Sequence, residues 1–111
     1  MFNIKKHIRD TLKELNVPCY LATNFNSTEN MYFVFFIDKS SIYEVYDDKD
    51  YSMKYSITLY LNSQVDYDDI ADKTYKLLKD NNFKIAYTAE DYDNQTKYYT
   101  KAFKLEYLNY L

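Results

Sequence analysis

The first helical pattern of the chain lies close to its N-terminus. Four apolar residues recur at spacings of three or four and therefore share one side of a helix over about residues 3–15: Ile4, Ile8, Leu12 and Leu15. Asn3 is the predicted N-cap, because its side-chain oxygen can accept a hydrogen bond from an unpaired amide of the first turn. Val17 and Pro18 end the helix, since the residue before a proline is forced out of the helical region.

Strand patterns follow over residues 19–62. A short strand is expected over residues 19–22, and residues 31–38 are apolar in both alternation phases, which predicts an internal strand covered on both faces or one that uses its second face in an interface. A turn near residues 40–41 would lead into another strand over residues 42–46. Residues 51–62 alternate strictly between apolar and polar positions. One face of that strand is therefore expected to pack in the core and the other to face solvent.

From Asp66 the period becomes helical again. One helix face carries Tyr67, Ile70, Ala71, Thr74, Leu77 and Leu78. Aspartates open this helix and lysines close it, as the helix dipole favours, and Asn81 with Asn82 forms the C-terminal stop. A strand from Phe83, a turn over residues 90–95 and a long final strand from Tyr99 complete the chain.

These elements predict one domain over residues 1–111 of the α+β class, since 111 residues are enough for a single core. The expected order is α-β-β-β-β-α-β-β, with a mainly antiparallel sheet and both helices packed on one face. The longest apolar run, residues 31–37, is far too short to span a bilayer. The opening residues lack the apolar run of a signal peptide, so a cytosolic chain is expected.

Composition removes several function classes. The chain has no glycine, which excludes glycine-rich phosphate loops and leaves asparagine and aspartate for turns that need positive φ. Its single cysteine, Cys19, can form no internal disulfide. Residues 41–72 carry a net charge of −6, which argues against DNA binding as the main role. Fifteen tyrosines suggest either codon bias of an AT-rich genome or an aromatic interaction surface.

Candidate chemistry is sparse. Cys19 and His7 could form a thiolate–base pair, but a buried cysteine and an exposed histidine are the simpler interpretation. The acidic run from Asp91 lacks the glycine and glutamate that a calcium loop needs. The Asp47, Asp48 and Asp50 cluster could hold magnesium only loosely, and Tyr98–Tyr99 with Tyr43 and Tyr46 could stack bases. We therefore predict no enzyme, no metal site and no cofactor.

Three features together resemble the tail terminator, or tail completion, proteins of long-tailed phages and phage-derived tail-like particles. They are the opening helix that leads into Val17–Pro18, the long alternating strand that runs into a helix over residues 51–78, and the ending over residues 90–103, an acidic turn before a final alternating strand. The resemblance spans nearly the whole chain.

The resemblance implies a virion structural protein that forms a ring, expected to be a hexamer, on the last ring of tail-tube subunits. Such a ring stops tube polymerisation and offers a joining surface to neck, collar or connector proteins, and in contractile tails or bacteriocin particles it also lies near the sheath. Assembly would take place in the host bacterial cytoplasm, and the ring would remain in the virion or tail-like particle. The expected partners are other copies of the chain and tail-tube protein, without specific nucleic acid or membrane.

The resemblance also directs attention to two sets of residues. The expected subunit interface comprises Met31, Phe33, Phe35, Ile37, Tyr43 and Tyr46. The acidic turn with Asp47, Asp48 and Asp50 would face the ring lumen and keep passing DNA from binding. Two alternatives stay open, a head-tail connector protein of the neck and a small acidic inhibitor that mimics DNA.

Overall fold

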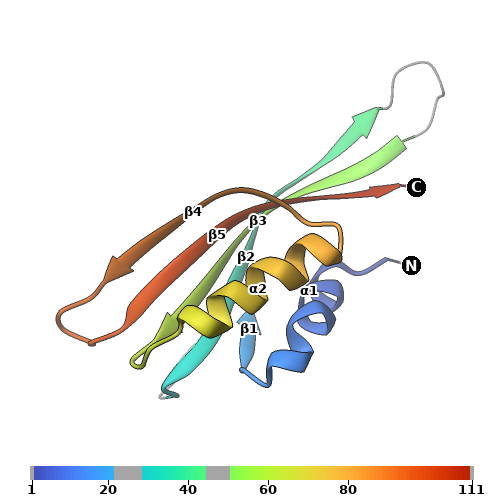
Figure 1. Ribbon diagram of the computed structural model, residues 1–111. Coiled ribbons are helices and arrows are strands. Elements are labelled where there is room, and N and C mark those ends of the chain that lie inside the picture. Colours follow the sequence, from blue (N-terminus) through green and yellow to red (C-terminus); the bar gives the residue numbers. More distant parts are fainter. Residues whose placement is uncertain (1, 22–28, 45–50, 111) are drawn as a thin grey trace.

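Two helices cover one face of a five-stranded sheet (Figure 1). The computed structural model describes residues 2–21, 29–44 and 51–110. In chain order the elements are α1 (Ile4–Leu12), the 3-10 turn η1 (Lys13–Leu15), β1 (Cys19–Leu21), β2 (Met31–Glu44), β3 (Tyr51–Ser63), α2 (Asp68–Asp80), β4 (Lys84–Tyr92) and β5 (Tyr99–Tyr110). The predicted α+β class is confirmed.

The strands lie in the order β1-β2-β3-β5-β4. The pairs β2–β3, β3–β5 and β4–β5 are antiparallel, and only the short β1 runs parallel to its neighbour β2. Strand β2 therefore lies inside the sheet up to Phe35, as predicted for residues 31–38, but residues 36–38 have one neighbouring strand among the described elements. The helices cover only one of its faces, and Phe36 on the other face is 42 % exposed. The mainly antiparallel sheet with both helices on one face is confirmed as well.

The predicted turn near residues 40–41 is wrong. Strand β2 continues without a break from Met31 to Glu44, so three strands rather than four precede α2. The pairing register with β3 shifts between Ile37 and Lys39, which leaves Asp38 as the extra residue of a β-bulge. Beyond Ile37 the strand extends past the helices, so its side chains need not be apolar. The resulting polar run therefore resembled the sequence of a turn.

Asparagines mark the ends of both helices. The Asn3 side chain accepts a hydrogen bond from the Lys6 amide at 3.1 Å, which confirms the predicted N-cap. Asn16 and Asn82 adopt left-handed backbone angles, with φ of 56° and 70°, directly after helical segments. The third positive φ in the described residues belongs to Lys97, so the expectation that asparagine or aspartate would occupy every such position is wrong.

We expect Asn3→Ala to lower the free energy of unfolding by about 1 kcal/mol, because it leaves an amide of the first α1 turn without its partner. Urea unfolding of the purified chain measures the change. The control is Asn30→Ala, which removes an exposed asparagine that makes no side-chain hydrogen bond within the described residues. Equal losses in the two variants would contradict a capping role for Asn3.

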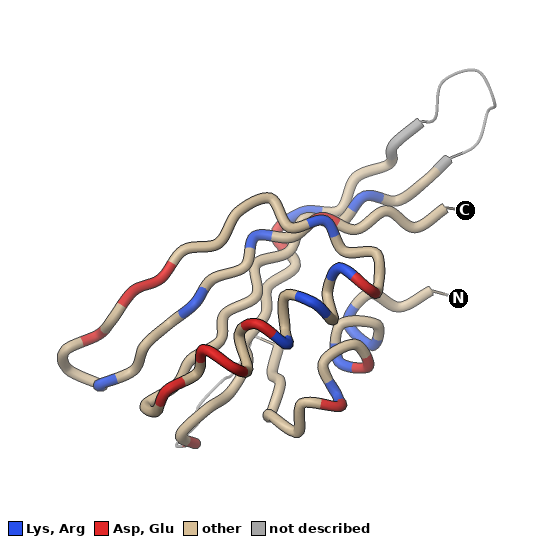
Figure 2. Tube along the Cα trace, viewed as in Figure 1, with Lys and Arg blue, Asp and Glu red and all other residues tan. Residues whose placement is uncertain are grey.

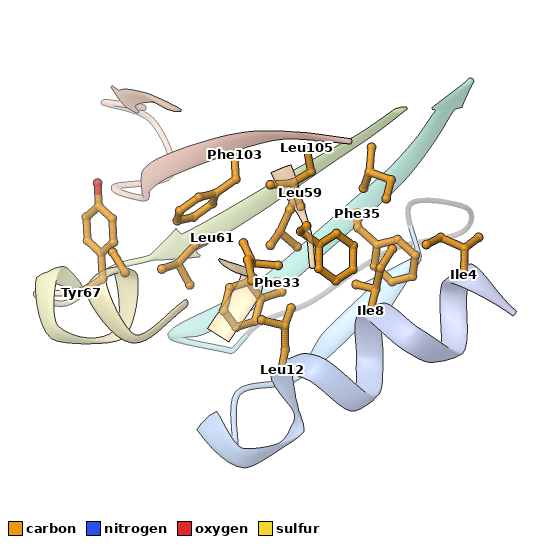
Figure 3. Close-up of a cluster of buried hydrophobic side chains, with 14 residues drawn as sticks. Ile4, Ile8, Leu12, Phe33, Phe35, Leu59, Leu61, Tyr67, Phe103 and Leu105 are labelled. Atoms are coloured by element: carbon orange, nitrogen blue, oxygen red, sulfur yellow. The ribbon is translucent and has the colours of Figure 1, made fainter. Parts of the chain in front are cut away.

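The core lies between the sheet and the two helices (Figure 3). Strands β2, β3 and β5 supply Phe33, Phe35, Ile57, Leu59, Leu61, Phe103 and Leu105, all fully buried. Helices α1 and α2 cover them with Ile4, Ile8, Leu12, Ala71 and Leu78. Two buried threonines, Thr11 and Thr74, donate to carbonyls four residues earlier in their own helices, at 2.7 Å each, so their hydroxyl groups are satisfied.

Candidate interaction surfaces

Both hairpins of the sheet extend beyond the helices. Figure 1 shows the β2–β3 arm, with the end of β5 beside it, running past α1 at one end, and the β4–β5 hairpin running past α2 at the other. The molecule measures 51 × 28 × 23 Å and its radius of gyration is 15.1 Å, whereas a compact domain of about 100 residues has a radius near 13 Å. These two arms are single layers of sheet and leave side chains uncovered.

Several of the uncovered side chains are large and apolar. Ile42 on β2 is 69 % exposed, Tyr110 on β5 is 70 % exposed and Tyr87 on β4 is 62 % exposed. Single exposed apolar residues are ordinary on protein surfaces, but these lie on strands that lack a covering layer. The arms are therefore the part of the described chain best suited to contacts with other molecules.

Backbone groups of the sheet are also open on two sides. Strand β4 is an edge strand, and all of its side chains except Ile85 are exposed. On the opposite side, β1 pairs with β2 only up to Phe35, so residues 36–44 of β2 have a single neighbouring strand, β3, among the described elements. Open edges of this length provide unpaired amides and carbonyls that another strand can complete.

The sheet face opposite the helices carries an aromatic pair and a charged cluster. The rings of Phe36 and Tyr60 meet edge to face, with centroids 5.8 Å apart. Next to them the Lys104 ammonium and the Thr58 hydroxyl both donate to the Asp38 carboxylate. Burial alone would raise the pKa of Asp38, but these hydrogen bonds and the Lys104 charge outweigh burial and hold it below its ordinary value. The β-bulge is thus fixed to β3 and β5 by a charged side chain.

A pocket of about 420 Å³ lies between the start of α2 and the β4–β5 hairpin. It is lined by Gln64, Val65, Asp66, Tyr67, Asp68, Glu90 and Tyr99. Figure 2 shows acidic residues on both the first turn of α2 and the outer half of β4. The Glu90 carboxylate accepts a hydrogen bond from the Tyr67 hydroxyl and also pairs with Lys101 at 3.4 Å. This end of the molecule therefore presents negative charge beside aromatic rings.

We expect Tyr67→Phe to reduce the loss of stability at alkaline pH. Burial, followed by the charge and hydrogen bond of Glu90, raises the pKa of Tyr67 from 10.0 to about 12. The folded chain therefore keeps the phenol proton longer than the unfolded chain does, so this group's contribution to stability is complete below pH 10 and is lost as the pH rises towards 12. Urea midpoints at pH 8, 10 and 11 measure it.

The control for the Tyr67 prediction is Tyr75→Phe, which removes a hydroxyl from a 44 % exposed tyrosine of the same helix. An alkaline profile of Tyr67→Phe identical to that of the unmodified chain would contradict the prediction.

The residues predicted for a subunit interface differ in their placement. Phe33 and Phe35 are fully buried against the chain's own helices, whereas Met31 and Ile37 are only partly buried at the border of the same core. The backbone of Tyr43 pairs with Ser52 near the end of the β2–β3 arm. Tyr46 and the predicted lumen residues Asp47, Asp48 and Asp50 lie outside the described residues.

The histidine and the cysteine belong to different surroundings. His7 is half-buried rather than exposed, because its ring stacks on Phe83 at 5.2 Å and lies 4.9 Å from Tyr107. This aromatic cluster ties α1 to the segment after α2 and to β5. Cys19 packs at the edge of the core, and burial raises the pKa of its thiol from 9.0 to about 11 although Arg9 acts in the opposite direction.

The structure also shows the positions of the tyrosines that the sequence analysis considered for base stacking. Tyr99 contacts Tyr92 and Tyr67, with ring centroids at 4.5 and 6.2 Å, while Tyr98 lies against Tyr32 and donates its hydroxyl to the Glu29 carbonyl at 2.7 Å. Among the described residues, no set of three His, Cys, Asp or Glu side chains could hold a metal ion. The helices of these residues include none that is long and apolar enough to cross a membrane.

Two features of these surfaces were missed at the level of sequence. The bulge at Asp38 depends on how β2 pairs with β3, and the open edge from residue 36 depends on where β1 stops pairing. No periodicity reveals either feature. The pocket beside Tyr67 needs Glu90 and Tyr99, which are brought to the start of α2 by the order of the sheet. The tyrosine excess was the one available signal, because Tyr99 contacts both Tyr67 and Tyr92 there.

The architecture defines the chain as an α+β protein with two helices on one face of a five-stranded sheet and arms at both ends. Among solved structures, it is similar to a chain from the virion of a native gene transfer agent particle, with a TM-score of 0.61 and 6 % sequence identity. The similarity covers 97 % of this chain and 92 % of that chain. No protein-family model matches the chain, and no curated protein sequence matches it.

Proposed function

We propose that this chain is a structural, non-enzymatic protein of a phage-like virion or tail-like particle, in which it caps the end of the tail tube as a ring. The observation that carries the proposal is the fold similarity to a chain of a gene transfer agent virion, which extends over almost the full length of both chains. The resemblance of the sequence to tail terminator proteins supports the finer role, since it involves the same opening helix, strand-to-helix unit and final strand.

The shape of the molecule fits an assembly role. A ring subunit must offer surface to two neighbours and to the tube below. This chain has arms at both ends and, among its described elements, open sheet edges on both sides. Exposed Ile42, Tyr87 and Tyr110 supply apolar surface on these arms.

Within this proposal, strand β2 lies at the subunit interface. Met31 and Ile37 are partly buried and would contact a neighbour together with Tyr43 and Tyr46, while Phe33 and Phe35 support the strand from the core. The acidic residues Asp47, Asp48 and Asp50 line the lumen of the proposed ring.

We expect a triple Asp47→Lys, Asp48→Lys and Asp50→Lys variant to slow DNA passage through the ring, because positive charge in the lumen attracts phosphates. Infectivity of particles that carry the variant measures the effect, and the same three positions changed to asparagine separate loss of negative charge from gain of positive charge. Unchanged infectivity of the lysine variant would contradict the lumen assignment.

The experiment that tests the terminator role is electron microscopy of induced particles from a strain that lacks this gene. Overlong or ragged tubes are expected, because nothing would stop the polymerisation of tube subunits. Tubes of normal length would reject the terminator role, and detached heads would then identify the connector alternative. Intact particles with normal tails would favour the small inhibitor instead.

A further inference from the structure

We propose that copies of this chain join head to tail by pairing the open edge of β4 in one copy with the open edge of β2 in the next. The inference deepens the proposed ring and rests on it, since it names the strands that would hold the neighbours together. It follows from the lengths and directions of the two edges and from the charges of the helices beside them.

The two edges match in length and lie on opposite sides of one sheet. Strand β4 has nine residues, Lys84–Tyr92. The part of β2 that extends beyond its last pair with β1 runs over residues 36–44, which is also nine residues. The β4 edge of one copy can therefore pair along the whole open part of β2 in the next copy. In a row of copies, only the first and the last would keep an open edge.

The strand directions favour the same arrangement. Strand β4 is antiparallel to β5, β5 to β3, and β3 to β2, so β4 runs opposite to β2. Across one sheet Thr88 is level with Phe35, so a second copy must also be displaced along the strands by about five residues to bring the open part of its β2 beside the first copy's β4. In the same orientation and with that displacement, its β2 runs antiparallel to β4. Antiparallel ladders are slightly more stable per residue than parallel ones.

Charge distinguishes head-to-tail pairing from a symmetric dimer. Residues 66–93, which include α2 and β4, carry a net charge of −4, and residues 2–21, which include α1 and β1, carry +2. Helix α1 contacts β1 and helix α2 contacts β4, the two outermost strands. These charges therefore lie near opposite edges of the sheet, on the same face. Pairing β4 with β4 would bring two acidic α2 sides together, whereas pairing β4 with β2 places the acidic α2 side nearer the neighbour's basic α1. The two strands themselves, residues 84–92 and 36–44, each carry a net charge of −1, so this preference comes from the helices beside them.

Repeated head-to-tail contacts are heterologous, so they produce a closed ring where the rotation between copies closes and an open row where it does not. The exposed side chains of the edges suit such a contact. Ile42 and Tyr87 would gain cover from the neighbouring strand, and Lys39 and Asp91, which form no ion pair within the described residues, lie on edges that would meet.

Disulfide trapping tests the contact directly. Ser40 is the midpoint of the open part of β2 and Thr88 the midpoint of β4; both are exposed, and both lie on the helix-bearing face because they pair with Tyr55 and Phe103. Residues directly opposite in an antiparallel ladder have Cα atoms about 4.5 to 5.5 Å apart, within the range of a disulfide. Inside one chain, three strand spacings alone separate them by about 14 Å, and their offset along the strands adds to this distance, so no internal bond can form.

The purified full chain with Cys19→Ser, Ser40→Cys and Thr88→Cys is oxidised at high concentration and analysed without reductant. We expect a ladder of trimers and larger multimers, whereas each single-cysteine chain stops at dimers. A chain with Thr88→Cys and Gln95→Cys, both on the β4 side, is the matched control for random encounters. A ladder that stops at dimers, or one equally strong in the control, overturns the edge pairing.

The two proposals fail separately. Normal tail length in the deletion strain rejects the terminator role whatever the ladder shows. Overlong tails in the deletion strain together with no ladder reject the β4–β2 contact and leave the ring to another surface.

Discussion

Phe35→Ala is expected to lower the free energy of unfolding by about 3 to 5 kcal/mol. The Phe35 ring is fully buried, lies between Leu21 and Leu59 in the ladder and is covered by the Arg9 guanidinium at 5.8 Å. Its truncation removes apolar contacts and leaves a cavity between β2 and α1. Because domains of this size are stable by about 5 to 15 kcal/mol, the change removes a large fraction of the total.

The adjacent residue provides a matched control. Phe36 has the same side chain on the same strand, but it points to the opposite face, is 42 % exposed and its ring meets that of Tyr60. We expect Phe36→Ala to cost about 1 kcal/mol or less in the isolated chain, because one aromatic contact and partial burial are lost. Urea unfolding of both variants gives the comparison.

The outcome that contradicts this prediction is an equal loss in both variants, since it would mean that the sheet face opposite the helices is as well covered as the core. A small loss for Phe35→Ala alone would mean that the helices do not pack on β2 as described.

Local signals were sufficient for most of the fold. Asn3 at the start of α1, Asn82 after α2 and the strict alternation over residues 51–62 each depend on neighbours within a few residues, and each prediction is confirmed. The apolar residues of α1 and α2 repeat at helical spacing, so the core-facing sides of both helices could be identified as well.

One error arose where distant parts of the chain decide the structure. Continuation of β2 beyond Ile37 depends on β3, which supplies a pairing partner for every residue from Lys39 to Glu44. The positive φ at Lys97 is a different kind of error, because it lies in the short turn between β4 and β5, where the Asp93 carbonyl accepts the Lys97 amide at 2.8 Å. The interaction is local, but lysine is not a residue type that marks a positive φ.

For the interaction surfaces too, local patterns were informative and contacts between distant residues were not predictable. Tyrosine excess and the apolar residues 31–37 pointed to an interface, but alternation alone could not separate Phe33 and Phe35, which are core, from Phe36, which is exposed. That separation requires knowledge of which sheet face the helices cover. The open edges required still more, because they depend on the order of all five strands.

Cys19 is expected to react with a thiol reagent at pH 8 at least about 100-fold more slowly in the folded chain than in the urea-unfolded chain. Only the thiolate reacts, and burial raises the pKa of this thiol from 9.0 to about 11. At pH 8 the thiolate fraction therefore falls from about 10 % in the unfolded chain to about 0.1 % in the folded chain. Limited access at the edge of the core slows the reaction further.

The rate of colour release from an aromatic disulfide reagent measures this protection, with and without 8 M urea. A chain with Cys19→Ser and Gln95→Cys is the control, because Gln95 lies exposed in the turn between β4 and β5 and should react at similar rates in both conditions. A native Cys19 rate within tenfold of the unfolded rate would contradict the burial of β1 against the core. It would also mean that β1, which borders the open part of β2 used in the head-to-tail contact, separates readily from the sheet in solution.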